Sequence, residues 1–303
     1  MRRLARIAAA VAALVAIAAV VAPLAIMLRE PDELRTLPAD VPGRLVDVGG
    51  RRVHVVERGE GPPVVLIHGF GASTHDFVER VLEPLARTRH VIAVDLFGHG
   101  WSERRDDFAY GWTLWSEQIA GTLDALAIRR TAILGHSMGG AVASVFAARH
   151  PDRVDRLILA DAFYPPTPDE ITPAFRALRT PVLGEIALGA ITDVSAPGFS
   201  AAHHARAVAW CRIRGTRRGM LRYVRDPTKL AELTAAYPAI TAPTLVLHGS
   251  ADQFARYAAM QRAVPAMRTA RIVTIDGGGH FPFRDDPERL VQDVEAFLAA
   301  TTD

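Results

Sequence analysis

Gly135-His136-Ser137-Met138-Gly139-Gly140 carries the strongest fold signal of the chain. It follows the apolar run Ala132-Ile133-Leu134 and opens a helical pattern. A G-x-S-x-G sequence between a strand and a helix is typical of a nucleophile elbow, which exposes a serine hydroxyl at the top of a sheet. Side chains at Gly135 and Gly139 would collide with the neighbouring strand and helix. The pattern predicts Ser137 as a nucleophile, with the N–H of Met138 pointing to where an oxyanion forms.

Continuous apolar runs recur along the chain, and such runs are typical of strands buried on both faces of a parallel sheet. They are Pro63–Ile67, Val91–Val94, Ala132–Leu134, Leu157–Leu159, Thr244–Leu247 and Arg271–Ile275. Helical patterns lie between most of them or follow the last, at Phe77–Ala86, Leu114–Leu126, Ala141–Ala148 and Arg289–Ala299. Two alternating runs joined by Gly49-Gly50 predict a hairpin, at Arg44–Val48 and Arg51–Val56. The alternation predicts an α/β fold, a mostly parallel sheet flanked by helices.

One stretch interrupts this alternation. From Pro165 to about Ile240 the sequence has helical patterns and several prolines but no good strand. We expect a helical cap insertion, about residues 165–240, over the carboxyl edge of the sheet, inside a domain of residues 44–303. Arginines crowd the cap between Arg212 and Arg225. They are consistent either with a solvated face or with contact to acidic lipid head groups.

The N-terminus has the pattern of a membrane segment. Residues 7–28 contain no charged side chain, and a run of about 20 apolar residues can cross a bilayer as a helix. The alternative is a cleaved signal peptide, but Pro23 follows Ala22, the best small residue for cleavage. We therefore expect a single-pass membrane anchor at residues 1–29, followed by a linker at 30–43.

The charges beside this segment predict its orientation. Arg2, Arg3 and Arg6 precede it, and arginine clusters stay in the cytoplasm. The catalytic domain should then be extracytoplasmic, or secreted if the segment is cleaved as a signal.

Composition and motifs argue against nucleic acid, an internal disulfide, a cofactor and a metal. A formal net charge of +2 does not favour nucleic acid, and a single cysteine, Cys211, forms no internal disulfide. The sequence lacks a P-loop, an H-E-x-x-H motif, and a G-x-G-x-x-G after a strand. His203-His204 has no partner ligands at useful spacing. We therefore expect no cofactor and no metal, and the oligomeric state is left open.

A nucleophilic serine needs a histidine to take its proton and an acid to orient that histidine. His280 lies in a glycine-rich loop after the last predicted strand, and Asp252 follows the strand Thr244–Leu247. The order Ser, Asp, His along the chain is that expected for this elbow type. Asp161, after Leu157–Ala160, is a second candidate for the acid. We prefer Asp252 because its turn contains glycine, which lets the loop swing the carboxylate toward His280.

A second oxyanion donor is expected beside the elbow. His68-Gly69-Phe70-Gly71 follows the strand Val64–Ile67, and a glycine-rich loop there can offer the N–H of Phe70. The alternative is a plain strand-to-helix turn.

Taken together, these motifs resemble the capped α/β-hydrolase family, particularly its serine esterase and lipase-like members. The resemblance covers about Arg44 to the C-terminus and rests on the following segments: His68-Gly69-Phe70-Gly71, Asp95-Leu96-Phe97-Gly98-His99-Gly100-Trp101-Ser102, Gly135-His136-Ser137-Met138-Gly139-Gly140, Gly249-Ser250-Ala251-Asp252 and Gly278-Gly279-His280-Phe281-Pro282. It implies that Ser137 is the nucleophile, Asp252 the acid and His280 the base. It also implies that the amides of Phe70 and Met138 form the oxyanion hole.

The expected reaction is hydrolysis of a carboxylic ester through an acyl-enzyme on Ser137. Apolar residues in and before the cap, Phe163, Leu183 and Ile186, are expected to bind a hydrophobic acyl group. Dehalogenases and epoxide hydrolases resemble this chain but use an aspartate at the position of Ser137. Carbon–carbon hydrolases of the meta-cleavage-product type share a similar Ser-Met-Gly-Gly elbow and stay open as an alternative. A non-catalytic binding module of the same fold is a second alternative.

Overall fold

The structure is a computed structural model that describes residues 37–181, 183–194, 209–211 and 213–300, together with Ile17 and Val21. Its centre is an eight-stranded sheet in the order β1-β2-β4-β3-β5-β6-β7-β8. The strands are β1 (Arg44–Asp47), β2 (Arg52–Arg58), β3 (Pro63–Ile67), β4 (His90–Val94), β5 (Thr131–His136), β6 (Val154–Ala160), β7 (Thr244–Gly249) and β8 (Ala270–Ile275). β2 pairs antiparallel with β1 and β4, and every other pair is parallel. The predicted mostly parallel sheet is confirmed.

The central strands form because their side chains are buried on both faces. Every residue of β5 and β7 is buried, as expected for strands with helices above and below. In the hairpin that joins β1 to β2, Gly49 and Gly50 both have positive φ, +61° and +79°, which glycine adopts without steric cost. The register pairs His136 at the end of β5 with Ala160 at the end of β6. This pairing brings the elbow next to the segment that follows β6.

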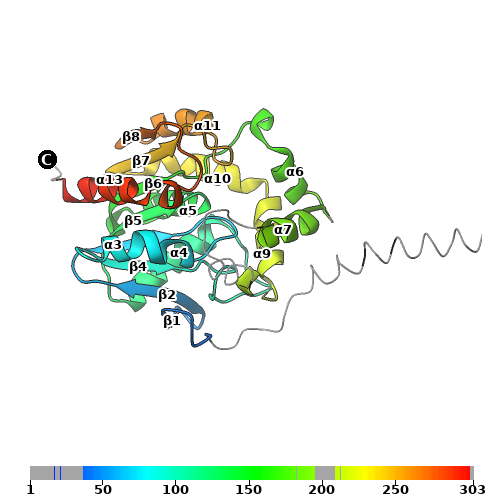
Figure 1. Ribbon diagram of the computed structural model, residues 1–303, viewed down its shortest axis with the longest axis horizontal. Coiled ribbons are helices and arrows are strands. Elements are labelled where there is room, and N and C mark those ends of the chain that lie inside the picture. Colours follow the sequence, from blue (N-terminus) through cyan, green and yellow to red (C-terminus); the bar gives the residue numbers. More distant parts are fainter. Residues whose placement is uncertain are drawn as a thin grey trace, which may run out of the picture.

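Helices cover both faces of the sheet (Figure 1). One face is covered by a helical segment at residues 75–85, with a π-helical stretch at Val78–Leu82, and by α12 (Pro282–Asp285) and α13 (Pro287–Ala299). The other face is covered by α4 (Trp112–Ala125), α5 (Met138–Arg149) and α11 (Tyr257–Ala263). Each face has its own apolar cluster, which is why the sheet lies at the centre of the core.

Between β6 and β7 the described residues form helices and no strand. They are α6 (Pro173–Arg179), α7 (Leu183–Val194), α9 (Thr216–Arg225) and α10 (Thr228–Ala236). α10 packs against α5, whereas α6, α7 and α9 contact one another and are grouped beside the sheet in Figure 1. Tyr223 of α9 packs on Trp112 and Trp115 of α4, with ring centroids 4.9 and 5.1 Å apart. This contact fixes α9 to the body of the domain.

A buried histidine, His54, connects the segment before β1 to the sheet. His54 on β2 donates from Nδ1 to Asp95 over 2.7 Å and from Nε2 to the carbonyl of Pro42 over 2.9 Å. Burial alone would lower the pKa of His54, but the Asp95 carboxylate and these hydrogen bonds raise it. Asp95 also accepts hydrogen bonds from the N–H groups of Thr74 and Trp101. An ion pair therefore ties Pro42 to the loops that follow β3 and β4.

The predicted membrane anchor at residues 1–29 lies outside the described residues except for Ile17 and Val21, and so does the first half of the predicted linker. Among the helices that the structure does describe, none has both the length and the apolar character needed to span a bilayer.

Candidate active site

The elbow is a strained turn that only glycine neighbours permit. Ser137 has φ +51° and ψ −121°, an unfavourable conformation for a residue with a side chain. A Cβ on Gly135 would lie 2.4 Å from the carbonyl oxygen of Gly139, and one on Gly139 would lie 2.2 Å from that of Ile67. The turn is held by the segment after β6, because the N–H of Phe163 donates to the carbonyl of Ser137 over 2.8 Å. The backbone thus presents Ser137 at the carboxyl edge of the sheet.

The structure brings Ser137, His280 and Asp252 into one hydrogen-bonded chain. His280 Nε2 lies 3.0 Å from Ser137 Oγ, and His280 Nδ1 lies 2.7 Å from Asp252 Oδ2. The second oxygen of Asp252 accepts from the N–H groups of Phe254 and Ala255, at 2.7 and 2.9 Å. These are the distances that a base and its orienting acid need to activate a hydroxyl.

The loops that carry the acid and the base are packed against each other. The N–H of Ala251 donates to the carbonyl of Gly278 over 3.0 Å. A Cβ on Gly249 would lie 2.3 Å from that same carbonyl oxygen, so the two loops meet at backbone distance. His136 Nε2 donates to the carbonyl of His280 over 2.7 Å. Burial lowers the pKa of His136 well below its usual value, so that imidazole is a neutral support for His280.

The two predicted oxyanion donors belong to segments that flank Ser137. Met138 is buried at the first position of α5. A Cβ on Gly69 would lie 3.1 Å from the Cβ of Ser137, so the loop containing Phe70 passes directly beside the serine. His68 shapes this loop, because its Nδ1 donates to the carbonyl of Gly69 and its Nε2 accepts from the N–H of Leu96. The loop and the start of α5 can therefore offer N–H groups to one oxyanion.

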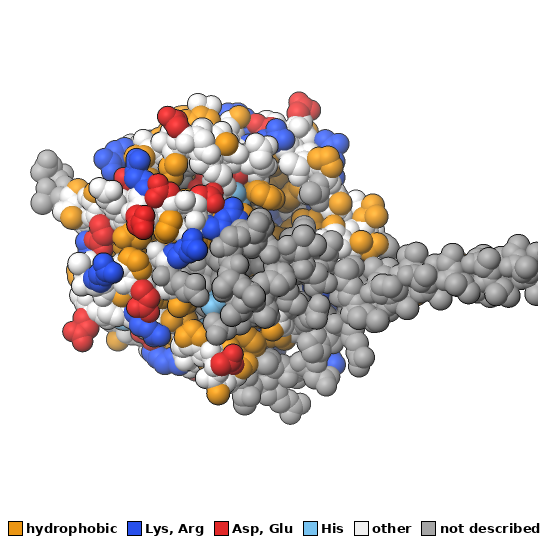
Figure 2. All heavy atoms as spheres, viewed as in Figure 1, with side chains coloured by type: hydrophobic (Ala, Val, Ile, Leu, Met, Phe, Trp, Pro, Cys, Tyr) orange, Lys and Arg blue, Asp and Glu red, His pale blue; other side chains and the backbone are white. Residues whose placement is uncertain are grey.

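The predicted substrate-binding residues lie at different depths. Phe163 is half-buried next to the elbow, and its ring stacks on that of Phe175 in α6 with centroids 6.4 Å apart. Ile186 is half-buried on α7, whereas Leu183 at the start of α7 is 53% exposed. The substrate-binding role of Leu183 stays a prediction. On the face seen in Figure 2, apolar side chains gather over α6 and α7.

Phe254 is a residue near the triad to which the sequence analysis assigned no role. Its ring is 71% exposed, yet its centroid lies 5.1 Å from that of His280. This large exposed aromatic ring beside His280 forms part of the rim of the candidate site. Phe254 stands two residues after Asp252 in the sequence, but no local pattern indicates that its ring lies next to His280.

Among the described residues, Asp161, the alternative acid, makes no hydrogen bond to His280 but lies beside Asp252. One ligand atom each of Asp161, His248 and Asp252 fall within 4.8 Å of one another, and all three residues are buried. In the described part of the chain this is the group whose spacing could suit a metal ion. However, His248 Nε2 donates to the carbonyl of Ala255 over 2.7 Å, and Asp252 already accepts three N–H groups.

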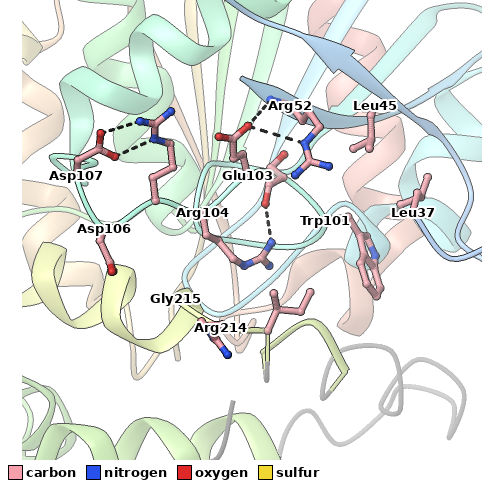
Figure 3. A pocket seen from close by; sticks show the side chains of 13 residues that line it. Leu37, Leu45, Arg52, Trp101, Glu103, Arg104, Asp106, Asp107, Arg214 and Gly215 are labelled. Atoms are coloured by element: carbon pink, nitrogen blue, oxygen red, sulfur yellow. Dashed lines mark hydrogen bonds and ion pairs between the residues drawn. The ribbon is translucent and has the colours of Figure 1, made fainter. Parts of the chain in front are cut away.

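A pocket of about 520 Å³ is lined by residues outside the triad (Figure 3). It lies between the loop after β4 and the segment before α9, and Trp101, Arg104 and Arg214 are among its lining residues. Its polar groups are joined to one another, as in the paired hydrogen bonds of 2.9 Å from Arg105 to Asp107. No triad residue lines it, so we do not regard it as the substrate pocket.

Comparison with known proteins agrees with this geometry. The sequence profile of the Alpha/beta hydrolase family matches residues 64–293. A 2-hydroxymuconate semialdehyde hydrolase from a Pseudomonas species is 40% identical over 119 residues, 39% of this chain. The matched segment covers 42% of that relative's length, so the comparison concerns less than half of it.

Two solved structures extend the likeness over most of the chain. A meta-cleavage product hydrolase from Pseudomonas fluorescens has a TM-score of 0.70 at 23% identity, covering 85% of this chain and 97% of that one, which shows a shared fold. A bacterial membrane phospholipase A has a TM-score of 0.68 at 26% identity, covering 98% of both chains. With the fold, the elbow and the matching profile together, this chain belongs to the alpha/beta hydrolase family.

Proposed function

We propose that the protein is a serine hydrolase in which Ser137 attacks a carbonyl carbon. The observation that carries the proposal is the continuous chain from Ser137 Oγ through His280 to Asp252, with distances of 3.0 and 2.7 Å. His280 Nε2 takes the hydroxyl proton as the Ser137–carbon bond forms, and the Asp252 carboxylate stabilises the resulting imidazolium. The amides of Phe70 and Met138 hold the oxyanion of the tetrahedral intermediate.

The rest of the cycle uses the same groups. The intermediate collapses, the bond to the leaving group breaks, and the leaving group departs with the proton from His280. Water then attacks the acyl-enzyme while His280 takes a water proton. The second tetrahedral intermediate releases a carboxylic acid and returns the proton to Ser137, so no oxidant, reductant or metal is needed.

The first candidate substrate is a compound in which a carbon–carbon bond next to a ketone is cleaved, as in products of aromatic ring fission. It is supported by the matches to a 2-hydroxymuconate semialdehyde hydrolase and a 2-hydroxy-6-oxo-2,4-heptadienoate hydrolase, at 40% and 41% identity. A carbon leaving group departs only when conjugation delocalises its electron pair. We therefore expect the substrate to be a dienoate, in which the departing carbon becomes a stabilised dienolate before it is protonated.

The second candidate is a carboxylic ester with a hydrophobic acyl chain, including a lipid ester. It is supported by the alignment with a membrane phospholipase A over 98% of this chain, and by the exposed ring of Phe254 above His280. An ester needs no conjugation because its leaving oxygen departs as an alcohol when the His280 imidazolium protonates it. The two candidates therefore share the triad and differ in what must surround the leaving group.

The location of the domain belongs to the same proposal. Residues 1–29 act as a single-pass anchor that holds the domain outside the cytoplasm, which the uncharged run at 7–28 and the preceding arginines support. A reporter enzyme that works only outside the cytoplasm, fused after Asp303, should be active. A silent reporter on a stable fusion would contradict this orientation.

The chemistry is tested in two stages on the full chain. A fluorophosphonate should label the wild type, should fail to label Ser137→Ala, and should still label Ser144→Ala, whose hydroxyl bonds back to the carbonyl of Gly140 inside α5. In the second stage, the hydrolysis rates of labelled and unlabelled enzyme are compared. The substrates are a 2-hydroxy-6-oxo-dienoate and p-nitrophenyl esters of increasing chain length. A folded wild type that is not labelled and cleaves neither substrate would favour the binding module instead.

A further inference from the structure

Asp161 is a buried carboxyl whose hydrogen bonds are incomplete. Its side chain has no exposed surface, and its Oδ1 accepts from the N–H of Gly249 over 2.7 Å. Among the atoms that the structure describes, its Oδ2 is buried without a hydrogen-bond partner. The backbone of Asp161 has φ +41°, and its N–H donates to the carbonyl of Leu247. A strained backbone and a buried polar atom without a partner are features that persist where they serve a function.

The neighbouring carboxyl, Asp252, is in the opposite situation. It accepts hydrogen bonds from His280 Nδ1 and from two backbone N–H groups, so three donors point at its two oxygens. Asp161 accepts from one N–H only. Two ionised carboxylates side by side in a buried site repel each other, and the usual solution is that the pair keeps one proton. The hydrogen-bond pattern places that proton on Asp161.

The groups around the pair agree with this assignment. Burial is the largest cause that raises the pKa of Asp161, the N–H of Gly249 opposes it, and the charge of Asp252 raises it further, to about 8. Asp285 adds a smaller repulsion. His248 Nδ1 lies 3.9 Å from Asp161 Oδ1, and burial lowers the pKa of this histidine, so it supplies no positive charge. Tyr164 is neutral because burial, and then Asp161, raise its pKa.

We propose that Asp161 is protonated in the resting enzyme and donates a hydrogen bond to the carboxylate of Asp252, as a positioning residue for the triad. The inference rests on the proposed serine-hydrolase function. The O–H of Asp161 holds the carboxylate toward His280 without adding a charge. When Asp161 loses its proton at alkaline pH, a second negative charge appears beside Asp252 and the support is lost.

Two substitutions separate the hydrogen bond from the charge. Asp161→Asn replaces the O–H donor by an amide N–H donor that never ionises, and asparagine tolerates a positive φ. Asp161→Gly removes the donor without straining the backbone, which an alanine at φ +41° would do. The full-length wild type and both variants are compared by their rate of fluorophosphonate labelling and their melting temperature from pH 5 to pH 10.

The labelling rates test the positioning role. At pH 6 to 7, Asp161→Asn should label within about threefold of the wild type, while Asp161→Gly should label about tenfold or more slowly, the effect of losing a hydrogen bond to a charged group. Above about pH 8 the wild type should slow relative to Asp161→Asn. Equal impairment of both variants, or identical pH profiles for wild type and Asp161→Asn, would overturn the proposal.

The melting temperatures test, independently of activity, whether Asp161 is protonated in the folded protein. The pKa of Asp161 is higher in the folded protein than the value near 3.8 of an unfolded chain, so the folded state keeps a proton that the unfolded state has lost. Its contribution to stability is complete below pH 3.8 and is lost as pH rises to about 8. Asp161→Asn should therefore gain in melting temperature relative to wild type from pH 5 to pH 8 and then level off. A constant difference would show that Asp161 is ionised throughout.

Two further outcomes separate a failure of the proposed function from a failure of the positioning role. A wild type that never labels would overturn the serine-hydrolase function and with it the positioning role, while the melting curves would still decide where the proton is. Loss of wild-type labelling after treatment with a chelator would overturn the proposal in favour of a cation held by Asp161, His248 and Asp252.

Discussion

The carboxyl edge of the sheet and the helices between β6 and β7, which we call the cap, are built in different ways. At the sheet edge Asp252, His280 and the glycines around Ser137 are buried or in backbone contact, and a Cβ at several of these glycines has no space. In the cap Leu183 is 53% exposed. The arginines there pair with acidic groups at the surface, as Arg218 does with Asp106 and Arg225 with Glu185. We therefore expect reaction chemistry to depend on backbone geometry, and substrate choice on side chains that have more room to vary.

Ser137→Ala should have the largest effect at the sheet edge. Removing the nucleophile of a Ser-His-Asp triad lowers turnover by about 10⁵- to 10⁶-fold, because the remaining groups act only with it. The measurement is turnover on the best substrate from the two-stage assay, at matched melting temperature. Activity near that of wild type would place the chemistry elsewhere and remove the basis for the comparison.

Asp252→Asn should have the next largest effect. The amide cannot stabilise the imidazolium or hold the right tautomer of His280, so turnover at neutral pH should fall by about 10³- to 10⁴-fold with little change in folding. Asp161→Asn is the matched control at the end of β6 and should stay near wild type. The reverse ranking would assign the acid to Asp161.

Gly139→Ala tests whether the edge is as tightly packed as it appears. The new Cβ would meet the carbonyl oxygens of Ile67 and His68 at 2.2 and 2.5 Å, and backbone atoms cannot rotate away. Unfolding free energy should fall by about 1 to 3 kcal/mol, as for overpacking in a core, and activity should fall with it. Gly49→Ala is the control, since Gly49 has positive φ but nothing within 4 Å. The loss from Gly49→Ala measures backbone strain alone, whereas Gly139 has no positive φ and its loss measures lack of space. A loss from Gly139→Ala smaller than that from Gly49→Ala would mean that the edge has room for the new Cβ.

Phe175→Ala should have the smallest effect of the four on turnover. It removes the ring that stacks on Phe163, so kcat/KM should change by less than about tenfold and should depend on substrate length. Leu183→Ala, on an exposed side chain, should change stability by no more than about 0.5 kcal/mol. A loss from Phe175→Ala as large as that from Asp252→Asn would show that the cap takes part in the chemistry.

Much of the sheet could be predicted because its strands are apolar on both faces. Continuous apolar sequence predicted the strands at Val64–Ile67 and Ala132–Leu134, where every residue is buried. Glycines indicated the turns of the elbow. The helix Tyr257–Ala263 was not predicted because it is short and follows the irregular loop that carries the acid. Ser137, Asp252 and His280 were brought together as expected, and their catalytic roles stay predictions.

The contacts that the sequence could not indicate depend on register and on loop packing. Ala160 pairs with Leu247, and this register places Asp161 beside the end of β7 and so beside Asp252. A shift of the pairing would change that neighbour without changing any motif. Phe254 reaches His280 only because the loops after β7 and β8 are joined at Gly278. Such proximity arises between elements, and no local pattern records it.

The joined loops after β7 and β8 have a consequence for the order in which the protein is made. Domains fold as units during synthesis from the N-terminus, and the base, His280, stands near the C-terminal end of the chain. β8 is the edge strand of the sheet, and it carries the loop that packs against the acid. A nascent chain that already contains Ser137 therefore has no partner to activate it. By the proposed mechanism, hydrolysis can therefore begin only when β8 has docked on β7.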